Sequence, residues 1–285
     1  MGILRLSNNW LISRLVYVFL EFTRNVPILL HILFVHSIFL YVFPVPKRAI
    51  SISDTFFFSN RGILIPSPVF GDGFGYVWIV LLIAIAIVAV FVYWAHKIQD
   101  ETGKIYPVFT ISLAILICLP LFTFFVSGAH LSWEIPVLKG FNFKGGTSIK
   151  PEYIALTFAL SYYTSCFIAE IVRGGILAIS RGQTEAAHAL GLRPNRTLQL
   201  VVIPQALRVI IPPLASQYLN LTKNSSLAIA IGYMDVVATI GGISLMQTGK
   251  EMETMIIVLL TYLFFSLIIS AFMNWFNRRM ALVER

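Results

Sequence analysis

The sequence has few charged side chains and few residues of the kinds that hold metals or form reactive thiols. Lys, Arg, Asp and Glu make up 12% of its 285 residues, whereas hydrophobic residues make up 58%. That balance excludes an ordinary soluble domain. The two cysteines, Cys118 and Cys166, fall in hydrophobic runs, where we interpret them as small packing residues. The five histidines lack metal-ligand spacing, so we expect no metal site.

Two glycine-rich stretches lack the features that bind nucleotides. Gly140–Thr147 has the outline of a phosphate-binding loop, but Gly146 stands where the phosphate-contacting lysine is required. Gly71–Gly75 precedes a hydrophobic run and lacks the strand context of a dinucleotide site. We therefore expect no cofactor, no ATPase site and no enzyme activity in this chain. Residues 1–24 are polar and basic, which argues against a cleavable signal peptide.

Long hydrophobic runs dominate the sequence instead. A run of roughly 18 or more uncharged residues is long enough to cross a membrane as a helix. We predict an all-α integral membrane domain over residues 25–277, with about six spans near residues 25–46, 77–95, 105–129, 153–172, 206–234 and 254–277. Residues 1–24 are expected to form a cytoplasmic N-terminal segment and residues 278–285 a cytoplasmic basic tail. The span at 206–234 is interrupted by Lys223 and by the pair Pro212-Pro213.

Basic residues set the predicted orientation. If the polar segment around Glu185 is cytoplasmic and the spans alternate, both termini are cytoplasmic as well. The segments assigned to the cytoplasm then carry more Lys and Arg than the outer segments, as expected for an inner-membrane protein. We attribute the net charge of +8 mostly to this asymmetry, and expect no nucleic-acid partner.

A polar, helix-forming segment separates two hydrophobic spans at residues 174–204. Thr184 is predicted to cap a helix whose first turn contains Glu185, and three nearby alanines favour that helix. Gly191 is expected to close the helix in a left-handed conformation, and Pro194 to lie in the first turn of the next one. A membrane protein that keeps such an insert between spans usually presents it to a soluble partner.

The spacing of Glu185-Ala186-Ala187, Gly191 and Val201-Val202-Ile203-Pro204 resembles the cytoplasmic loop of bacterial ABC importer permeases. In that family the loop is the coupling helix, which docks in a groove of the ATPase subunit. The resemblance implies a type I ABC importer transmembrane domain, driven by a separate dimer of ABC ATPase subunits. The ATPase-coupling residues that it implies are Glu185, Ala186, Ala187, Gly191 and Pro204.

Further segments are similar to permeases of the polar amino-acid uptake family, and most closely to its general L-amino-acid subgroup. They are Glu21–Leu30, Glu170–Ile176, Pro204–Arg208, Pro212–Leu214 and Leu221–Leu227. That subgroup has two extra spans, to which residues 76–128 correspond. The resemblance implies import of L-amino acids across the bacterial inner membrane, with a sister permease in a heterodimer and a periplasmic amino-acid-binding protein as partners. It also implies at least one further span ahead of the first of these segments, and this sequence begins just after the point where that span would end.

Polar residues in the span at 206–234 are candidates for the substrate path. Lys223, Asn224 and Ser225 are costly in a membrane unless they face a cavity or another helix. The resemblance implies that their helix lines the translocation path, whereas hydrogen bonding between helices at the dimer interface is the alternative. Glu170 and Arg173, three residues apart, are expected to pair at the cytoplasmic end of their span or to extend towards lipid headgroups.

Two other functions remain open from the sequence. An ion-coupled secondary amino-acid transporter would need carboxylates near the middle of the membrane, whereas most carboxylates here fall in loops and at the ends of spans. A shortened, non-transporting membrane subunit would be consistent with the position of Met1. Such a subunit, however, would have no need of an intact coupling loop.

Overall fold

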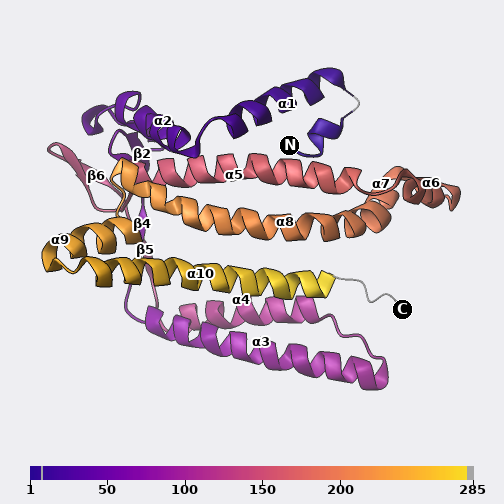
Figure 1. Cartoon of the computed structure of the whole chain (residues 1–285). Helices are drawn as coiled ribbons and strands as arrows, with labels where there is room; N and C mark the ends of the chain where they lie inside the picture. Colours follow the sequence, from indigo (N-terminus) through magenta and orange to yellow (C-terminus); the bar gives the residue numbers. More distant parts are fainter. Residues whose placement is uncertain (8, 281–285) are drawn as a thin grey trace. The chain divides into compact units, whose positions relative to one another are not determined.

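The computed structural model describes residues 1–7 and 9–280, so that most of the tail predicted at residues 278–285 lies outside the described residues (Figure 1). The chain forms two compact units. The first comprises Met1–Val45, Ser59–Gly62 and Ile149–Arg285, and the second comprises Pro46–Phe58 and Ile63–Ser148.

The first unit is helical. Its elements are η1 (Leu4–Leu6), α1 (Trp10–Asn25), α2 (Ile28–Tyr41), α5 (Pro151–Leu177), α6 (Arg181–Ala189), α7 (Pro194–Thr197), η3 (Leu198–Val202), α8 (Ile203–Asn224), η4 (Ser225–Ile231), η5 (Val237–Ser244), α9 (Leu245–Thr248) and α10 (Glu251–Met280). Here η3 and η5 are π-helical, and η1 and η4 are 3-10 helices.

The second unit contains two long helices and most of the short strands. Its elements are η2 (Pro46–Arg48), β1 (Ile50–Ile52), β2 (Phe56–Ser59), β3 (Gly62–Ile65), β4 (Ser67–Phe70), α3 (Phe74–Thr102), α4 (Val108–Val126), β5 (Leu131–Glu134), β6 (Val137–Lys139), β7 (Asn142–Lys144) and β8 (Thr147–Ile149). The last residue of β2, the first of β3 and the last of β8 belong to the first unit. One sheet has the order β1-β2-β3-β8, while β4 pairs with β5 and β6 with β7. The sequence did not predict these strands, because each is only three or four residues long.

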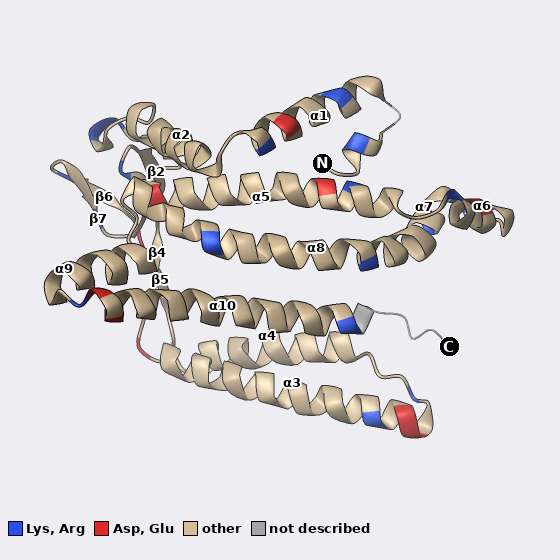
Figure 2. Ribbon diagram, in the orientation of Figure 1, with Lys and Arg blue, Asp and Glu red and all other residues tan. Residues whose placement is uncertain are grey.

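Five helical segments in the described residues are long and apolar enough to cross a membrane, and a sixth results if α1 and α2 count as one broken span. This confirms the predicted membrane domain with about six helical spans. Figure 2 shows that Lys, Arg, Asp and Glu lie mostly at the ends of the long helices and in the segments that connect them. The long apolar faces that remain suit contact with lipid or with other helices.

The first predicted span differs most from the structure. The helix within residues 25–46 is α2, which has only 14 residues, and residues 1–24, predicted as an N-terminal segment outside the membrane domain, contain most of α1. The two helices meet at an angle of 101°. Val26 precedes Pro27 and is extended, because the proline ring disfavours a helical conformation at the preceding residue. Charged residues interrupt the apolar sequence of α1, so its hydropathy is low and the sequence predicted no span there.

Helix α5 lies at the centre of the first unit. It packs against α1, α2, α8 and η4. Small side chains at Ala155 and Ala159 are completely buried in a cluster with Ile32 of α2 and Ala228 of η4. Small residues let helix backbones approach closely in a membrane, where apolar surface alone gives little driving force for association.

Helix α8 continues through the prolines that were expected to interrupt it. The candidate span runs from Pro194 to Ile231, and both Pro212 and Pro213 lie inside α8. A proline within a helix removes one backbone hydrogen bond, and in a membrane that loss is tolerated where neighbouring groups compensate for it. The structure therefore has one long helical path from the polar insert to η4.

Candidate functional site

Helix α6 forms the polar insert between α5 and α7. It begins at Arg181, directly after the extended residue Ser180. Thr184 therefore lies in the second turn, and the prediction that it caps the helix is wrong. Glu185 likewise lies beyond the first turn, which contains no acidic residue. The helix therefore starts one turn earlier than expected, with Ser180 at the N-cap position but without a capping hydrogen bond from its side chain.

The predicted end of α6 is confirmed. Gly191 has a φ of +79°, in the left-handed region that glycine adopts without strain. Its N–H donates to the carbonyl of His188 at 2.9 Å, and the N–H of Leu192 donates to the carbonyl of Ala187 at 3.1 Å. This pair of bonds is a Schellman motif, which satisfies the last carbonyls of a helix. Pro194 lies in the first turn of α7, also as predicted.

The two sides of α6 differ in exposure. Ala187 is 4% exposed, whereas Glu185 and Ala186 are exposed. Leu190, just beyond the helix, is 83% exposed. Within the part of the chain that the structure describes, the carboxylate of Glu185 forms no ion pair or side-chain hydrogen bond. The insert thus exposes the Glu185 carboxylate, and Leu190 is exposed just beyond the end of the helix.

The insert is attached to the start of α8. The side-chain amide of Gln205 donates to Oε1 of Gln183 at 3.3 Å. Pro204 has no N–H, so it cannot donate the usual helical hydrogen bond to the carbonyl of Leu200. The chain widens into the π-helical segment η3 just before Pro204, where the N–H of Ile203 donates to the carbonyl of Leu198. Pro204 therefore lies within a continuous helix rather than at a break.

Close packing joins α5 to α8 near the insert. A Cβ atom placed on Gly175 of α5 would lie 2.3 Å from Cγ1 of Ile210 on α8. At the neighbouring Gly174, by contrast, an added Cβ would meet no atom within 4 Å. A side chain at position 175 would require Ile210 to shift, so glycine there lets the helices on either side of α6 pack this closely.

An ion-pair network lies at the end of α5 nearest the insert. Nε of Arg173 donates to Oε1 of Glu170 at 3.0 Å, which confirms the predicted pair. Arg5 also forms an ion pair with the other oxygen of Glu170, a contact that the sequence did not predict because 165 residues separate the two. Glu170 therefore links α5 to the N-terminal segment.

The three residues predicted for the substrate path have different surroundings. Lys223 is exposed and Asn224, the last residue of α8, is half-buried. Ser225 begins η4, and its hydroxyl donates to the carbonyl of Thr222 at 2.7 Å. Of the three, only Ser225 lines a cavity in the first unit, called the polar cavity here because several hydroxyl groups line it.

The polar cavity has a volume of about 740 Å³ and lies between α5, the α8–η4 junction, the start of η5 and α10. Such a volume is typical of pockets for small molecules. Serine and threonine hydroxyls come from all four of these elements, at Thr157, Ser161, Thr222, Ser225, Thr239 and Thr261. The cavity and the insert are at opposite ends of α5 and α8, separated by roughly 25 Å at 1.5 Å per helical residue.

Asp235 is the cavity residue that the sequence analysis missed. It follows η4 and directly precedes the next helical segment, where its Oδ1 accepts from the N–H of Ala238 at 2.8 Å. The hydroxyl of Tyr262, on α10, lies 3.5 Å from Oδ2. In the sequence Asp235 is one of three acidic residues between two predicted spans, and nothing in the local pattern indicated what surrounds its side chain.

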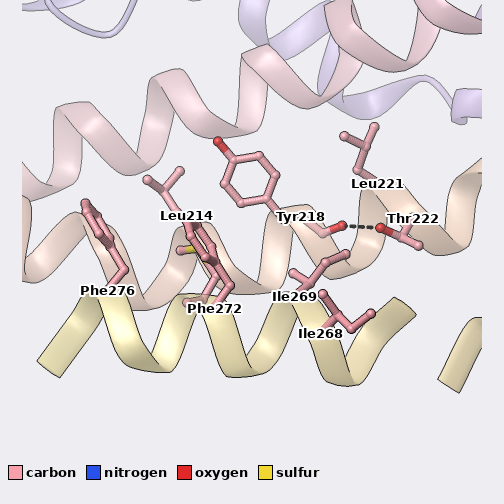
Figure 3. A pocket seen from close by; sticks show the side chains of 9 residues that line it. Leu214, Tyr218, Leu221, Thr222, Ile268, Ile269, Phe272 and Phe276 are labelled. Carbon is pink, nitrogen blue, oxygen red and sulfur yellow. Dashed lines mark hydrogen bonds between the residues drawn. The ribbon is translucent and has the colours of Figure 1, made fainter. Parts of the chain in front are cut away.

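A second, apolar groove lies between α8 and α10. It has a volume of about 460 Å³ and is lined mainly by aliphatic and aromatic side chains, including Leu214 and Phe272 (Figure 3). Its hydroxyls belong to Tyr218 and Thr222, and the latter donates to the carbonyl of Tyr218 at 3.0 Å. A groove without a charged residue suits hydrocarbon rather than a charged ligand.

The described residues contain no group of three or more His, Cys, Asp or Glu side chains that could hold a metal ion. Cys166 is buried with Leu20 and Ala169, in agreement with its interpretation as a packing residue. Cys118 is exposed on α4, a helix whose outward side chains are apolar nearly throughout.

Comparison with known proteins gives consistent matches along the chain. The family described as "Binding-protein-dependent transport system inner membrane component" matches residues 78–282. The general L-amino acid transport system permease protein AapQ of Rhizobium johnstonii is 50% identical over 284 residues, which cover 100% of this chain and 71% of the relative.

Two relatives come from Rhodobacter capsulatus. The glutamate/glutamine/aspartate/asparagine transport system permease protein BztB is 45% identical, with 99% of this chain and 73% of the relative covered. The permease protein BztC of the same named system is 30% identical over 130 residues, which cover 45% of this chain and 30% of the relative. The chain therefore belongs to the family of binding-protein-dependent transport system inner membrane components, and is a multi-pass protein of the inner membrane.

Proposed function

We propose that this chain is a permease subunit of an ATP-binding cassette importer for L-amino acids. Membership of the family supports the class of transporter, and the names of the two most extensively matched relatives above support the substrate class. The single observation that carries the proposal is α6. It is a short, polar helix with a defined end, held between two membrane helices, and Glu185 and Leu190 are exposed beside it.

In this proposal α6 is the contact with a dimer of separate ATPase subunits. Glu185 and Ala186 lie on its exposed surface, and Ala187 anchors its buried side. Gly191 fixes the direction in which the chain leaves the helix, and Pro204 lies in the helix to which the chain then connects. ATP binding and hydrolysis belong to the partner, so this chain itself has no catalytic residues.

Movement of α6 would reach the substrate path through α5 and α8. The two helices are packed against one another at Gly175 and Ile210, close to the insert. Both continue to the polar cavity at the other end of the unit. A tilt imposed on α6 by closure of the ATPase subunits would therefore move the helices that border the cavity. The cavity would then change from being open to one side of the membrane to being open to the other.

The transporter would contain a second, different permease subunit and an external binding protein. Two distinct permease proteins bear the name of one transport system in Rhodobacter capsulatus, and both match this chain. That pairing supports a heterodimer. A periplasmic amino-acid-binding protein would deliver the substrate, and the family description supports the dependence on a binding protein.

We propose that the substrate path passes the end of α8, beside Lys223, Asn224 and Ser225. Ser225 borders the polar cavity, and the other two residues precede it at the same end of the helix. Asn224→Leu removes a donor and an acceptor at similar volume, so uptake of many amino acids should fall together. If uptake of all the amino acids tested were unchanged in an assembled complex, the path would not pass Asn224.

Reconstitution tests the proposed function. The complete complex in proteoliposomes, supplied with the binding protein and with ATP inside, should accumulate labelled L-amino acids. Accumulation should depend on ATP and persist when ionophores collapse the proton and sodium gradients. Accumulation driven by an ion gradient without ATP would instead indicate a secondary transporter, and no accumulation under either condition would indicate a non-transporting subunit.

A further inference from the structure

The polar cavity has an uneven distribution of charge. Among the residues that line it, Asp235 is the only one with an ionisable carboxylate, and there is no lysine, arginine or histidine. The remaining polar groups are hydroxyls, which are neutral and can both donate and accept hydrogen bonds. The cavity wall formed by this chain therefore favours a positively charged group.

The Asp235 carboxylate has unused capacity to accept hydrogen bonds. Oδ1 is paired with the N–H of Ala238, whereas Oδ2 has only the long contact of 3.5 Å with Tyr262. Asp235 forms no ion pair within the described residues. An ionised carboxylate accepts about four hydrogen bonds. A carboxylate that is partly buried and has no ion-pair partner is stabilised by a cation.

A free amino acid brings such a cation, its α-ammonium group, together with a carboxylate. The ammonium group donates three hydrogen bonds, for which Oδ2 of Asp235 and the nearby hydroxyls are suitable acceptors. The substrate carboxylate, by contrast, finds no positive side chain on this wall. Lys223 lies outside the cavity lining and is exposed.

We propose that Asp235 binds the α-ammonium group of the transported amino acid, and that the substrate carboxylate is bound by a surface outside this cavity wall. This inference rests on the proposed function and adds a specificity-determining residue to it. The α-ammonium group is shared by all the usual substrates. Recognition of that group by one carboxylate is therefore compatible with a cavity that admits many side chains.

The second role of Asp235, as a helix cap, allows a clean test. Asn and Ser cap helices as well as Asp does. Asp235→Asn and Asp235→Ser therefore keep the acceptor for the N–H of Ala238 and remove the charge. Glu253→Gln is the matched control, because Glu253 is an exposed carboxylate of the same unit and does not line the cavity.

The probes are L-alanine and L-lactate, and L-lactate has a hydroxyl where L-alanine has its ammonium group. The equilibrium dissociation constant of each probe is measured on the solubilised complex without binding protein. The ratio of the two constants, L-lactate over L-alanine, is the preference ratio. We expect the complex with native Asp235 to prefer L-alanine, and either neutral variant to reduce that preference about tenfold or more, equivalent to about 1.4 kcal/mol. Glu253→Gln should leave the ratio unchanged.

An unchanged preference ratio in Asp235→Asn and Asp235→Ser would overturn the inference, as would equal binding of the two probes to the native complex. ATP-driven uptake by the native complex is measured in parallel. If uptake occurs while the preference does not depend on Asp235, the ammonium site is wrong and the proposed function stands. If the native complex takes up no amino acid, the proposed function itself fails.

Discussion

At the scale of single residues, backbone conformation and packing decide which positions of the insert are constrained. Gly191 needs glycine because its φ is +79°, although an added Cβ there would meet no atom within 4 Å. Gly175 is the opposite case, because its neighbours rather than its φ exclude a side chain. Both glycines belong to segments recognised in the sequence, but only the turn at Gly191 could be predicted, since it follows from local helix-capping rules.

The first prediction concerns Gly191. Gly191→Val places a β-branched residue in the left-handed region, at a cost of roughly 1–2 kcal/mol, and should redirect the chain after α6. Gly191→Asn should be milder, because asparagine tolerates this conformation. Uptake by the reconstituted complex should therefore fall more for valine than for asparagine.

Gly182→Val is the control for that comparison. Gly182 lies in α6, has no positive φ, and an added Cβ there would meet no atom within 4 Å. The substitution adds the same side chain to the same insert without the left-handed strain. Equal losses at positions 182 and 191 would mean that the conformation of Gly191 has no special importance for transport.

At the scale of elements, the contact between α5 and α8 holds the two sides of the insert together. Gly175→Ala should force the helices apart, since the new Cβ would lie far inside van der Waals distance of Ile210. Overpacking of this kind costs about 1–3 kcal/mol. The thermal unfolding temperature of the purified complex should fall, and so should uptake.

Gly174→Ala is the matched control for the adjacent position. Its Cβ would enter open space, and alanine favours helix over glycine by about 1 kcal/mol. We expect unchanged or slightly raised stability. If Gly175→Ala behaved like Gly174→Ala, the helices would not be in the close contact described here.

At the same scale, some helices could be predicted from the sequence and others could not. Most spans were predicted, because long apolar runs determine them, and the predicted boundaries lie close to those of α4 and α10. Helices α3 and α5 continue past the predicted ends at residues 95 and 172, to Thr102 and Leu177. The bend at Pro27 and the helix before it were missed, because α1 mixes charged and apolar residues. The start of α6 was misplaced by one turn, since the prediction relied on Thr184 as a cap and the helix begins after Ser180 without a side-chain capping bond.

The candidate site was predictable only where it depends on local sequence. Gly191, Pro194 and the Glu170–Arg173 pair follow from spacings of a few residues, and the structure agrees with them. Asp235 requires knowledge of how α5, α8 and α10 surround it, and such long-range contacts leave no local signal. The pair of Arg5 and Glu170 was missed for the same reason.

At the scale of the whole molecule, the helical unit has two candidate sites with different roles, one for a protein partner and one for the substrate. The insert at one end carries an exposed polar helix, and the cavity at the other carries hydroxyls and one carboxylate. Helices α5 and α8 connect them over roughly 25 Å. The central claim is that a soluble ATPase acts on the first of these sites to control access to the second.

Charge reversal on α6 tests that claim most directly. Glu185→Lys in the reconstituted complex should reduce ATP-driven amino-acid uptake about tenfold or more. The lysine would place a positive charge against an ATPase surface that is complementary to a carboxylate. Glu101→Lys is the control, since Glu101 is an exposed carboxylate at the end of α3. The account predicts normal membrane insertion of both variants, and loss of ATPase co-purification or of uptake only for Glu185→Lys. Unchanged co-purification and unchanged uptake in Glu185→Lys would contradict it.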